Sequence, residues 1–217
     1  MSCSPFIVPF NQLPETLPIF PLPGAIVMPG SELPLNIFEP RYINMVSDAL
    51  STHRMIGMIQ PDPIARDAKA LYHTGCAGRI TQYRETNDGR VEMVLSGVCR
   101  YDLGVELSTT RGYRLIVPDW SRFSGDYNNH ADQLHGEHDH LLRILKCYFD
   151  DKGLQTDWTM LETLSTERLM NTLSMALPIS ETDKQVLLET VEPARRLQTF
   201  TSLLGGGLQA PGSMTRH

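Results

Sequence analysis

The chain lacks any apolar run of the length that a membrane-spanning helix needs, which is about 20 residues. Its first residues, MSCSPFIVPFNQ, also lack the basic start and the long apolar stretch of a secretory signal. These absences argue against the classes of membrane and exported protein. We therefore expect a cytoplasmic protein that has no membrane partner.

Cysteine is scarce, and the four that occur, at positions 3, 76, 99 and 147, form no CxxC pair. Disulfide frameworks and zinc sites usually show such pairs or an export signal. Cys76 and Cys99 lie inside apolar strand patterns, so we interpret them as small buried hydrophobes. A chain of 217 residues buries roughly 70% of its unfolded surface and needs neither a metal nor a disulfide for stability.

Basic residues are too few for a nucleic-acid surface. The chain has 19 Lys and Arg against 25 Asp and Glu, which gives a formal net charge of −6, and no basic stripe is present. A nucleic-acid partner is therefore not expected. The phosphate-binding pattern GxxxxGK[ST] is also absent, which argues against ATP hydrolysis. We predict no cofactor.

The most informative segment that is present is residues 17–42, LPIFPLPGAIVMPGSELPLNIFEPRY. Short apolar pieces alternate there with Pro and Gly, which is typical of short strands in a barrel or sandwich. Pro40 suits the first turn of a helix, and Ile43, Val46 and Ala49 follow at helical spacing. The segment predicts strands that lead into a helix from Pro40 to about His53.

These residues resemble the amino-terminal domain of the Lon ATP-dependent protease, the LON substrate-binding domain, which also occurs alone in small bacterial proteins. Further segments match the same pattern, at residues 75–80, 95–101, 177–180 and 184–189. The resemblance covers residues 13–204 and identifies the chain as a stand-alone version. It implies a PUA-like β-barrel and a role in protein recognition.

The resemblance does not extend to the catalytic parts of that protease. Its Ser–Lys dyad has no matching segment, because none of the four lysines, Lys69, Lys146, Lys152 and Lys184, lies in a recognisable nucleophile context. Together with the missing phosphate-binding loop, this predicts that the chain is not an enzyme and has no catalytic residues.

We predict an α+β fold in two parts. Residues 13–120 form a mostly antiparallel PUA-like β-barrel, with its clearest hairpin around the turn Glu85-Thr-Asn-Asp-Gly89. After a polar boundary, residues 136–204 show helical spacing and form a small helical bundle. Its predicted helix signals are an end at Lys152-Gly153, a capping box at Thr159 to Glu162, and helix starts at Ser180 and Pro193. The Gly-rich tail, 205–217, has no apolar spacing and is expected to be disordered.

One stretch offers metal-binding side chains. Seven possible ligands lie within eleven residues: His130, Asp132, His135, Glu137, His138, Asp139 and His140. The stretch is loop-like and has no HxxxH spacing on a helix, so we interpret it as a solvated loop and predict no metal site.

Two other patterns have structural and functional interpretations. Gly75-Cys-Ala-Gly78 has the GxxG spacing that clamps nucleic acid in KH domains, but it precedes a strand, so a turn or bulge is favoured. Glu39 could be a general base, but it has no partner. We expect its carboxylate at the helix start, facing unpaired N–H groups, and Arg41 paired with it or with a strand carboxylate.

The predicted function is a non-catalytic protein-recognition module. It would bind unfolded or apolar polypeptide segments, by apolar contact and edge-strand pairing, as an adaptor or regulator of proteolysis. The substrate-binding residues are unknown from sequence; a seam between barrel and bundle is the expected place for a groove. Two alternatives are a PUA-like RNA-binding protein and a small-molecule or metal-dependent enzyme that uses the His-rich loop.

Overall fold

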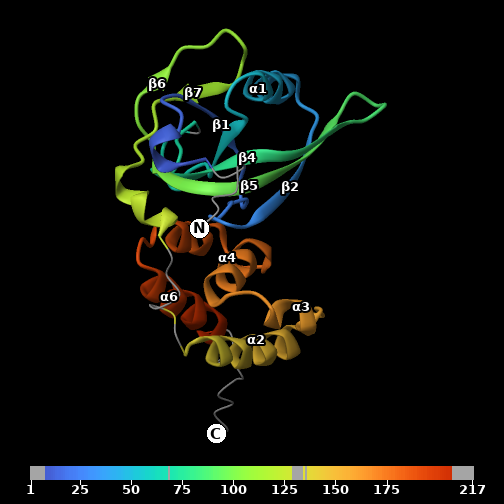
Figure 1. The fold of residues 1–217 in the computed structure, drawn as a ribbon, viewed down its shortest axis with the longest axis vertical. Helices are drawn as coiled ribbons and strands as arrows, with labels where there is room; N and C mark the ends of the chain where they lie inside the picture. Colours follow the sequence, from blue (N-terminus) through green and yellow to red (C-terminus); the bar gives the residue numbers. More distant parts are fainter. Residues whose placement is uncertain (1–7, 68, 129–133, 135, 207–217) are drawn as a thin grey trace, which may run out of the picture. The chain divides into compact units, whose positions relative to one another are not determined.

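The computed structural model describes residues 8–67, 69–128, 134 and 136–206 and is shown in Figure 1. The chain divides into two compact units. The first, here called the sheet unit, comprises Met1–Asn128 and Asn171–Val191. The second, here called the helical unit, comprises Asn129–Met170 and Glu192–His217.

One mixed sheet forms the centre of the sheet unit, with the strand order β2-β5-β4-β3-β1-β7-β6. Only β1 and β3 pair in parallel. The strands are β1 (Leu17–Pro21), β2 (Glu32–Ile37), β3 (Met55–Ile59), β4 (Thr74–Glu85), β5 (Val91–Asp102), β6 (Glu106–Leu107) and β7 (Arg114–Ile116). The predicted α+β class and the mostly antiparallel pairing are confirmed.

The prediction of a closed barrel is wrong, because β2 and β6 end the strand order and do not pair with each other. Closure requires two edge strands that can bond along their length. The strand β6 has two residues, Glu106 and Leu107, and Pro34 removes a backbone donor from the middle of β2. Both edges are therefore poor partners for closing the sheet.

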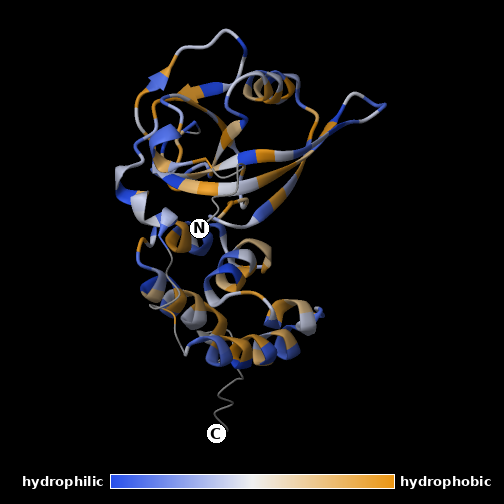
Figure 2. Cartoon of the chain, viewed as in Figure 1, coloured by the Kyte–Doolittle hydropathy of each residue, from blue (hydrophilic) through white to orange (hydrophobic). Residues whose placement is uncertain are grey.

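The long hairpin of β4 and β5 matches the prediction. Its turn lies at Thr86 to Gly89, where Thr86 N donates to Arg90 O at 2.9 Å and Gly89 has φ of +80°. In Figure 1 the turn end of the hairpin extends beyond the rest of the sheet. In β5, burial alternates from Val91 to Leu95, as expected for a strand with one face on the core, whereas the last five residues of β4 are exposed and mostly hydrophilic (Figure 2).

Segment 17–42 pairs with another family-like segment of the sequence. Gly97 N donates to Ser31 O at 2.8 Å, and Gly30 N donates to Gly97 O at 3.0 Å. A Cβ atom on Gly97 would lie 2.0 Å from Met28 O, so only glycine permits this approach. Residues 28–31 and residues 95–98 therefore pack directly against each other.

The helix α1 (Pro40–Ser51) begins at the predicted proline and packs on β1 and β3. Its buried residues Tyr42, Met45, Val46 and Ala49 join the larger core cluster, on one side of the sheet, together with Phe20, Met58 and Met93. A second cluster forms around Leu17, Ile19, Tyr101 and Ile116. Strand β1 is buried along its length because its residues contribute to both clusters.

The helix α5 (Glu181–Glu189) belongs to the sheet unit. The buried Gln185 donates to Thr74 O at 3.0 Å and accepts from Gln60 at 3.0 Å. Arg100 Nη1 donates to Leu188 O and Thr190 O at 3.0 and 2.7 Å, just where the helix ends. The unit boundaries therefore differ from the predicted ranges 13–120 and 136–204, because segment 171–191 bonds to the sheet.

The remaining helices follow their local signals closely. The helix α2 (His138–Lys152) ends at Gly153, which has φ of +61°, and α6 (Pro193–Gly206) begins at the predicted proline. Ser180 caps α5 by accepting from Asp183 N at 3.0 Å. The predicted capping box at Thr159 is wrong, since Asp157 caps α3 (Trp158–Glu162) and a separate α4 (Thr166–Ala176) follows. Two short 3-10 helices are η1 (Phe10–Gln12) and η2 (Ser121–Tyr127).

Candidate functional site

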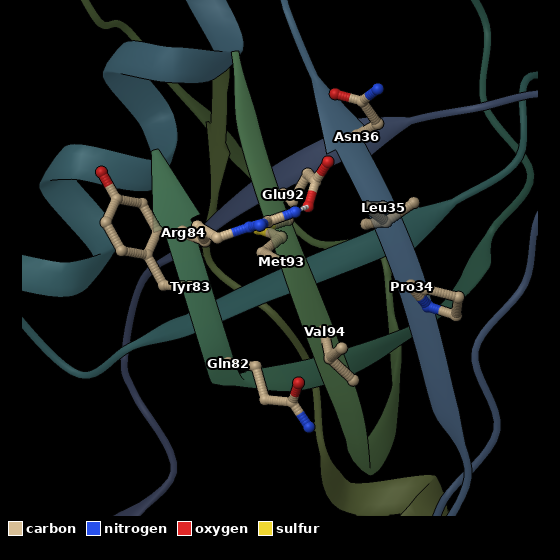
Figure 3. A pocket seen from close by; sticks show the side chains of 9 residues that line it. All are labelled: Pro34, Leu35, Asn36, Gln82, Tyr83, Arg84, Glu92, Met93 and Val94. Carbon is tan, nitrogen blue, oxygen red and sulfur yellow. Dashed lines mark hydrogen bonds and ion pairs between the residues drawn. The ribbon is translucent and has the colours of Figure 1, made fainter. Parts of the chain in front are cut away.

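A hollow of about 580 Å³ lies on the three-stranded part of the sheet formed by β2, β5 and β4 (Figure 3). Six side chains from alternate positions define what we call the outer face: Pro34, Asn36, Gln82, Arg84, Glu92 and Val94. The strand register places them in two rows, Pro34–Val94–Gln82 and Asn36–Glu92–Arg84. The outer face is therefore a flat array presented by three paired strands.

On the outer face, two adjacent apolar side chains have polar side chains as neighbours. Val94 and Pro34 lie side by side across the β5–β2 pair, and the amide of Gln82 lies on the other side of Val94. In the second row, Arg84 donates through Nε to Glu92 Oε2 at 3.1 Å. This hydrogen bond raises the pKa of Arg84. Such an arrangement suits a ligand that has both apolar side chains and amide groups.

Residues at the intervening positions support this surface from below. Leu35 and Met93 pack into the larger core cluster, so they hold the strands that carry the outer face. Tyr83 follows the same alternation but is 41% exposed, because it lies beyond the end of the core. Its hydroxyl donates to Glu85 Oε1 at 2.5 Å, and that hydrogen bond is the main cause of its raised pKa.

Strand β2 is an edge of the sheet, and its backbone pattern determines what the edge can bind. Gly97 N donates to Ser31 O, so by alternation the backbone N–H and C=O groups of Leu33, Leu35 and Ile37 point toward β5. The backbone groups at Glu32, Pro34 and Asn36 point toward the free edge. Pro34 has no N–H to offer at the centre of that free edge. A second strand could not pair along the whole of β2, which protects the edge from aggregation.

The outer face offers hydrogen-bonding and apolar groups. Its side chains are two amides, one ion pair and two apolar groups, with no nucleophile next to a base. Amides and an arginine can donate to backbone carbonyls, and Glu92 can accept from backbone N–H groups. None of these residues was singled out from sequence; the alternation of Leu33 and Leu35 with Pro34 and Asn36 is the signal that could have shown an exposed face.

The structure confirms the interpretation of two cysteines. Cys76 and Cys99 are free thiols and fully buried. Burial is the main cause that raises the pKa of both thiols, so neither reacts readily as a thiolate. Cys147 is an exposed free cysteine on α2, and Cys3 lies outside the described residues.

The polar residues of the opening segment are partly as predicted. Arg41 pairs with Glu39, with Nη2 at 2.9 Å from Oε2. Glu39 occupies the N-cap position of α1, but its side chain bonds to no helix N–H group. The expected contact of this carboxylate with unpaired N–H groups is therefore wrong: the guanidinium two residues away takes it instead, while the Glu39 backbone carbonyl accepts from Tyr42 and Ile43.

The GxxG pattern lies inside strand β4 and not before it, and it contains a bulge, which is one of the two favoured interpretations. A Cβ atom on Gly75 would lie 2.5 Å from Met58 O and from the Tyr101 hydroxyl. The register of β4 and β5 shifts between Ala77 and Gly78, which is a bulge. These glycines permit close packing within the sheet.

Of the proposed metal-binding stretch, His130, Asp132 and His135 lie outside the described residues. His138 and His140 begin α2, and His138 Nδ1 lies 3.4 Å from Thr166 Oγ1. Within the described ranges, no group of three His, Cys, Asp or Glu side chains could hold a metal ion. In the same part of the chain, no helix is long and apolar enough to cross a membrane.

Solved structures with a similar fold include Lon amino-terminal domains. A Lon N-terminal domain protein from Xanthomonas campestris is similar with a TM-score of 0.63 and 24% identity, over 86% of this chain and 97% of that one. The N-terminal domain of the Mycobacterium avium complex Lon protease is similar with a TM-score of 0.65 and 16% identity, over 88% of this chain and 98% of that one. Both similarities concern the fold.

Curated relatives are longer proteins. The Lon protease of Elusimicrobium minutum is 24% identical over 210 residues, which are 92% of this chain and 24% of that protein. The Lon protease of Parabacteroides distasonis is 31% identical over 109 residues, which are 48% of this chain and 13% of that protein. The chain thus spans about a quarter or less of the length of these relatives. A model of the ATP-dependent protease La (LON) substrate-binding domain matches residues 16–205, and the chain therefore belongs to the LON substrate-binding domain family.

Proposed function

We propose that this chain is a non-catalytic recognition module that binds unfolded or apolar polypeptide segments on the outer face. Membership of a substrate-binding domain family supports recognition of a polypeptide. The observation that carries the proposal is the pair of the half-buried Val94 and the exposed Pro34, flanked by the amides of Gln82 and Asn36. An apolar centre with a polar rim is the usual composition of a protein-binding surface.

The bound segment would lie across the strands. Its apolar side chains would contact Val94 and Pro34, and its backbone amides would bond to Gln82 and Asn36. Edge-strand pairing along β2, the second predicted binding mode, is restricted to the ends of the strand because Pro34 offers no donor. This binding mode contacts few side chains of the bound polypeptide specifically, so it tolerates many sequences.

The role of adaptor or regulator of proteolysis is part of the same proposal. It is supported by the relatives named as Lon proteases, of which this chain corresponds to a small part. The predicted absence of catalysis, cofactor and nucleic-acid partner, and the cytoplasmic location, stay predictions. So does a groove at the seam between the two predicted domains.

A binding assay with a permanently unfolded polypeptide tests the proposal. The ligand is a reduced, carboxymethylated and fluorescently labelled protein, and affinity is read from fluorescence anisotropy. We expect Val94→Glu to weaken binding at least about tenfold, because it places a charge at the apolar centre. Val105→Glu is the matched control, since Val105 is 69% exposed and lies outside the outer face.

Photo-crosslinking gives a second, positional test. A benzoylphenylalanine at position 82 should crosslink to the unfolded polypeptide, and the same group at position 105 should not. Equal crosslinking at both positions, or unchanged affinity in Val94→Glu, would remove the outer face from the proposal.

A further inference from the structure

A second hollow, which we call the motif cleft, lies at the first turn of α1. It has a volume of about 790 Å³, within the roughly 300–1,000 Å³ usual for small-ligand sites. Its charged walls are Arg41 on α1, Asp67 and Lys69 in the loop after β3, and Glu106 and Arg114 on β6 and β7. It shares no lining residue with the outer face.

The two carboxylates of the motif cleft are already engaged. Glu106 accepts from Arg114 Nε and Nη2 at 2.9 and 2.7 Å, and this bonding lowers the pKa of Glu106. Arg114 Nη1 donates to Lys69 O at 2.9 Å. Asp67 Oδ1 accepts from Lys69 N at 2.9 Å, within its own loop. Three basic residues and two acids line the cleft, but Arg41 is also paired with Glu39 beside it, so the charges of this group balance.

Three donors remain without a partner among the described residues. The ammonium of Lys69 forms no ion pair there, and Arg41 bonds to Glu39 through Nε and Nη2, which leaves Nη1. The third donor is the Tyr42 hydroxyl, which has no hydrogen-bond partner although only 5% of the residue is exposed. The Tyr42 hydroxyl oxygen is not one of the fully buried atoms that lack a partner, so water reaches it in the cleft, and a ligand that bonds to it replaces that water.

The protonation state of Tyr42 suits a donor. Burial is the largest influence and raises the pKa of its hydroxyl; the charge of Glu39 adds to this rise, while the charges of Arg41 and Arg114 oppose it. The hydroxyl therefore keeps its proton at neutral pH. The Tyr42 ring is held by Phe20, at 4.3 Å between centroids, and by the Arg41 guanidinium, at 4.5 Å from the ring.

The other walls of the motif cleft are apolar. Pro21, Leu71 and Leu103 line it beside the Tyr42 ring. A ligand that fills the cleft therefore needs an apolar part for these walls and an acceptor for the three donors. Because the charges around the cleft balance, a ligand with a single negative charge is favoured over a phosphate dianion.

We propose that the motif cleft binds a carboxylate carried on an apolar body, through the Tyr42 hydroxyl, the Lys69 ammonium and Arg41. This chemistry has two sources, the carboxyl-terminal residue of a polypeptide and a small organic acid. The inference stands independently of the proposed function, because it concerns different residues on a different surface.

Isothermal titration with N-acetyl-Leu-Leu as the free acid, its carboxamide and acetate tests the proposal on the whole chain. We expect the free acid to bind at least about tenfold more tightly than the carboxamide, because a hydrogen bond to a charged group is among the stronger ones. Acetate should bind more weakly than the dipeptide acid because it has no apolar body. Equal binding of acid and carboxamide, or no binding of the acid, overturns the proposal, and so does equal binding of acetate.

Two variants assign the donors. Tyr42→Phe removes only the hydroxyl and keeps the ring on Phe20, and Lys69→Gln removes an exposed charge, so both should fold. Each should weaken the dipeptide acid about tenfold and leave the carboxamide unchanged. The matched controls are Tyr83→Phe and Lys152→Gln, which lie outside the cleft. Wild-type affinity in both test variants contradicts the proposal.

A longer peptide distinguishes the two sources. An octapeptide that ends in Leu-Leu with a free carboxyl group binds as tightly as the dipeptide acid if the cleft accepts a polypeptide terminus. If its binding is lost, the ligand is a small organic acid. Val94→Glu should leave both titrations unchanged. Failure of the motif cleft to bind a carboxylate and failure of the outer face to bind a polypeptide are therefore separate results.

Discussion

The two ends of the β4–β5 hairpin carry the same kind of ion pair in opposite surroundings. At the base, Arg100 pairs with Asp126, and their side chains are 2% and 4% exposed. Near the turn, Arg84 pairs with Glu92, and their side chains are 73% and 45% exposed. The contribution of an arginine–carboxylate pair to the free energy of unfolding therefore depends on how deeply the pair is buried.

The difference shows how one hairpin serves two purposes. At the base, Arg100 also bonds to the carbonyls of Leu188 and Thr190, and its guanidinium stacks over Phe123 at 4.6 Å. It thus ties β5 to both η2 and the end of α5. Near the turn, the strands leave the core and their outer residues are free to contact a ligand. The four predictions below separate the supporting base from the binding end.

The largest effect is expected from Arg100→Met. It leaves Asp126 as a buried charge without its cation and leaves the carbonyls of Leu188, Thr190 and Val191 without their donor. Loss of one member of a buried pair costs about 3–5 kcal/mol of unfolding free energy. Urea denaturation followed by circular dichroism measures it. A loss no larger than that of Arg84→Met would contradict the distinction between the two ends.

A somewhat smaller effect is expected from Gly97→Ala. The added Cβ would meet the Met28 carbonyl oxygen at 2.0 Å, so the backbone must shift. Overpacking of this kind costs about 1–3 kcal/mol. The matched control is Gly125→Ala, where an added Cβ finds only Asn128 Nδ2 at 4.0 Å. Equal stability of the two variants in thermal denaturation would show that the contact between segments 28–31 and 95–98 is loose.

A pH-dependent effect is expected from His53, which lies between α1 and β3. Burial lowers its pKa below 6.5, and its Nδ1 accepts from Met55 N at 3.1 Å. The unfolded chain then binds a proton more readily than the folded one, so stability is complete above pH 6.5 and falls as the pH drops below that value. His53→Gln should flatten this part of the stability curve, whereas His73→Gln, at an exposed histidine, should not.

The smallest effect is expected from Arg84→Gln. The pair with Glu92 is exposed to solvent, so its loss should leave the midpoint of urea denaturation unchanged within error. Binding of the unfolded polypeptide is the informative measurement, because Arg84 belongs to the outer face. A clear loss of stability would show that the turn end supports the fold as well.

Local signals in the sequence predicted much of the secondary structure. The start of α1 at Pro40, the end of α2 before Gly153 and the cap at Ser180 each depend on the chemistry of a few neighbouring residues. The outer face was not predicted, because it exists only where β2 pairs with β5 in one particular register. The motif cleft was not predicted either, because its residues come from α1, the loop after β3, β6 and β7 and meet only in the fold. Two of them, Arg41 and Tyr42, belong to segment 17–42.

By itself, the sequence determined the family, the α+β class and the turns and caps that begin and end the elements, because each depends on short-range backbone preference or a recognisable motif. Only the tertiary structure decided that the sheet stays open and that α5 joins the sheet unit. Those outcomes depend on contacts between distant residues, such as Arg100 with Leu188 and Gln185 with Thr74, and no local pattern encodes which buried donor meets which carbonyl.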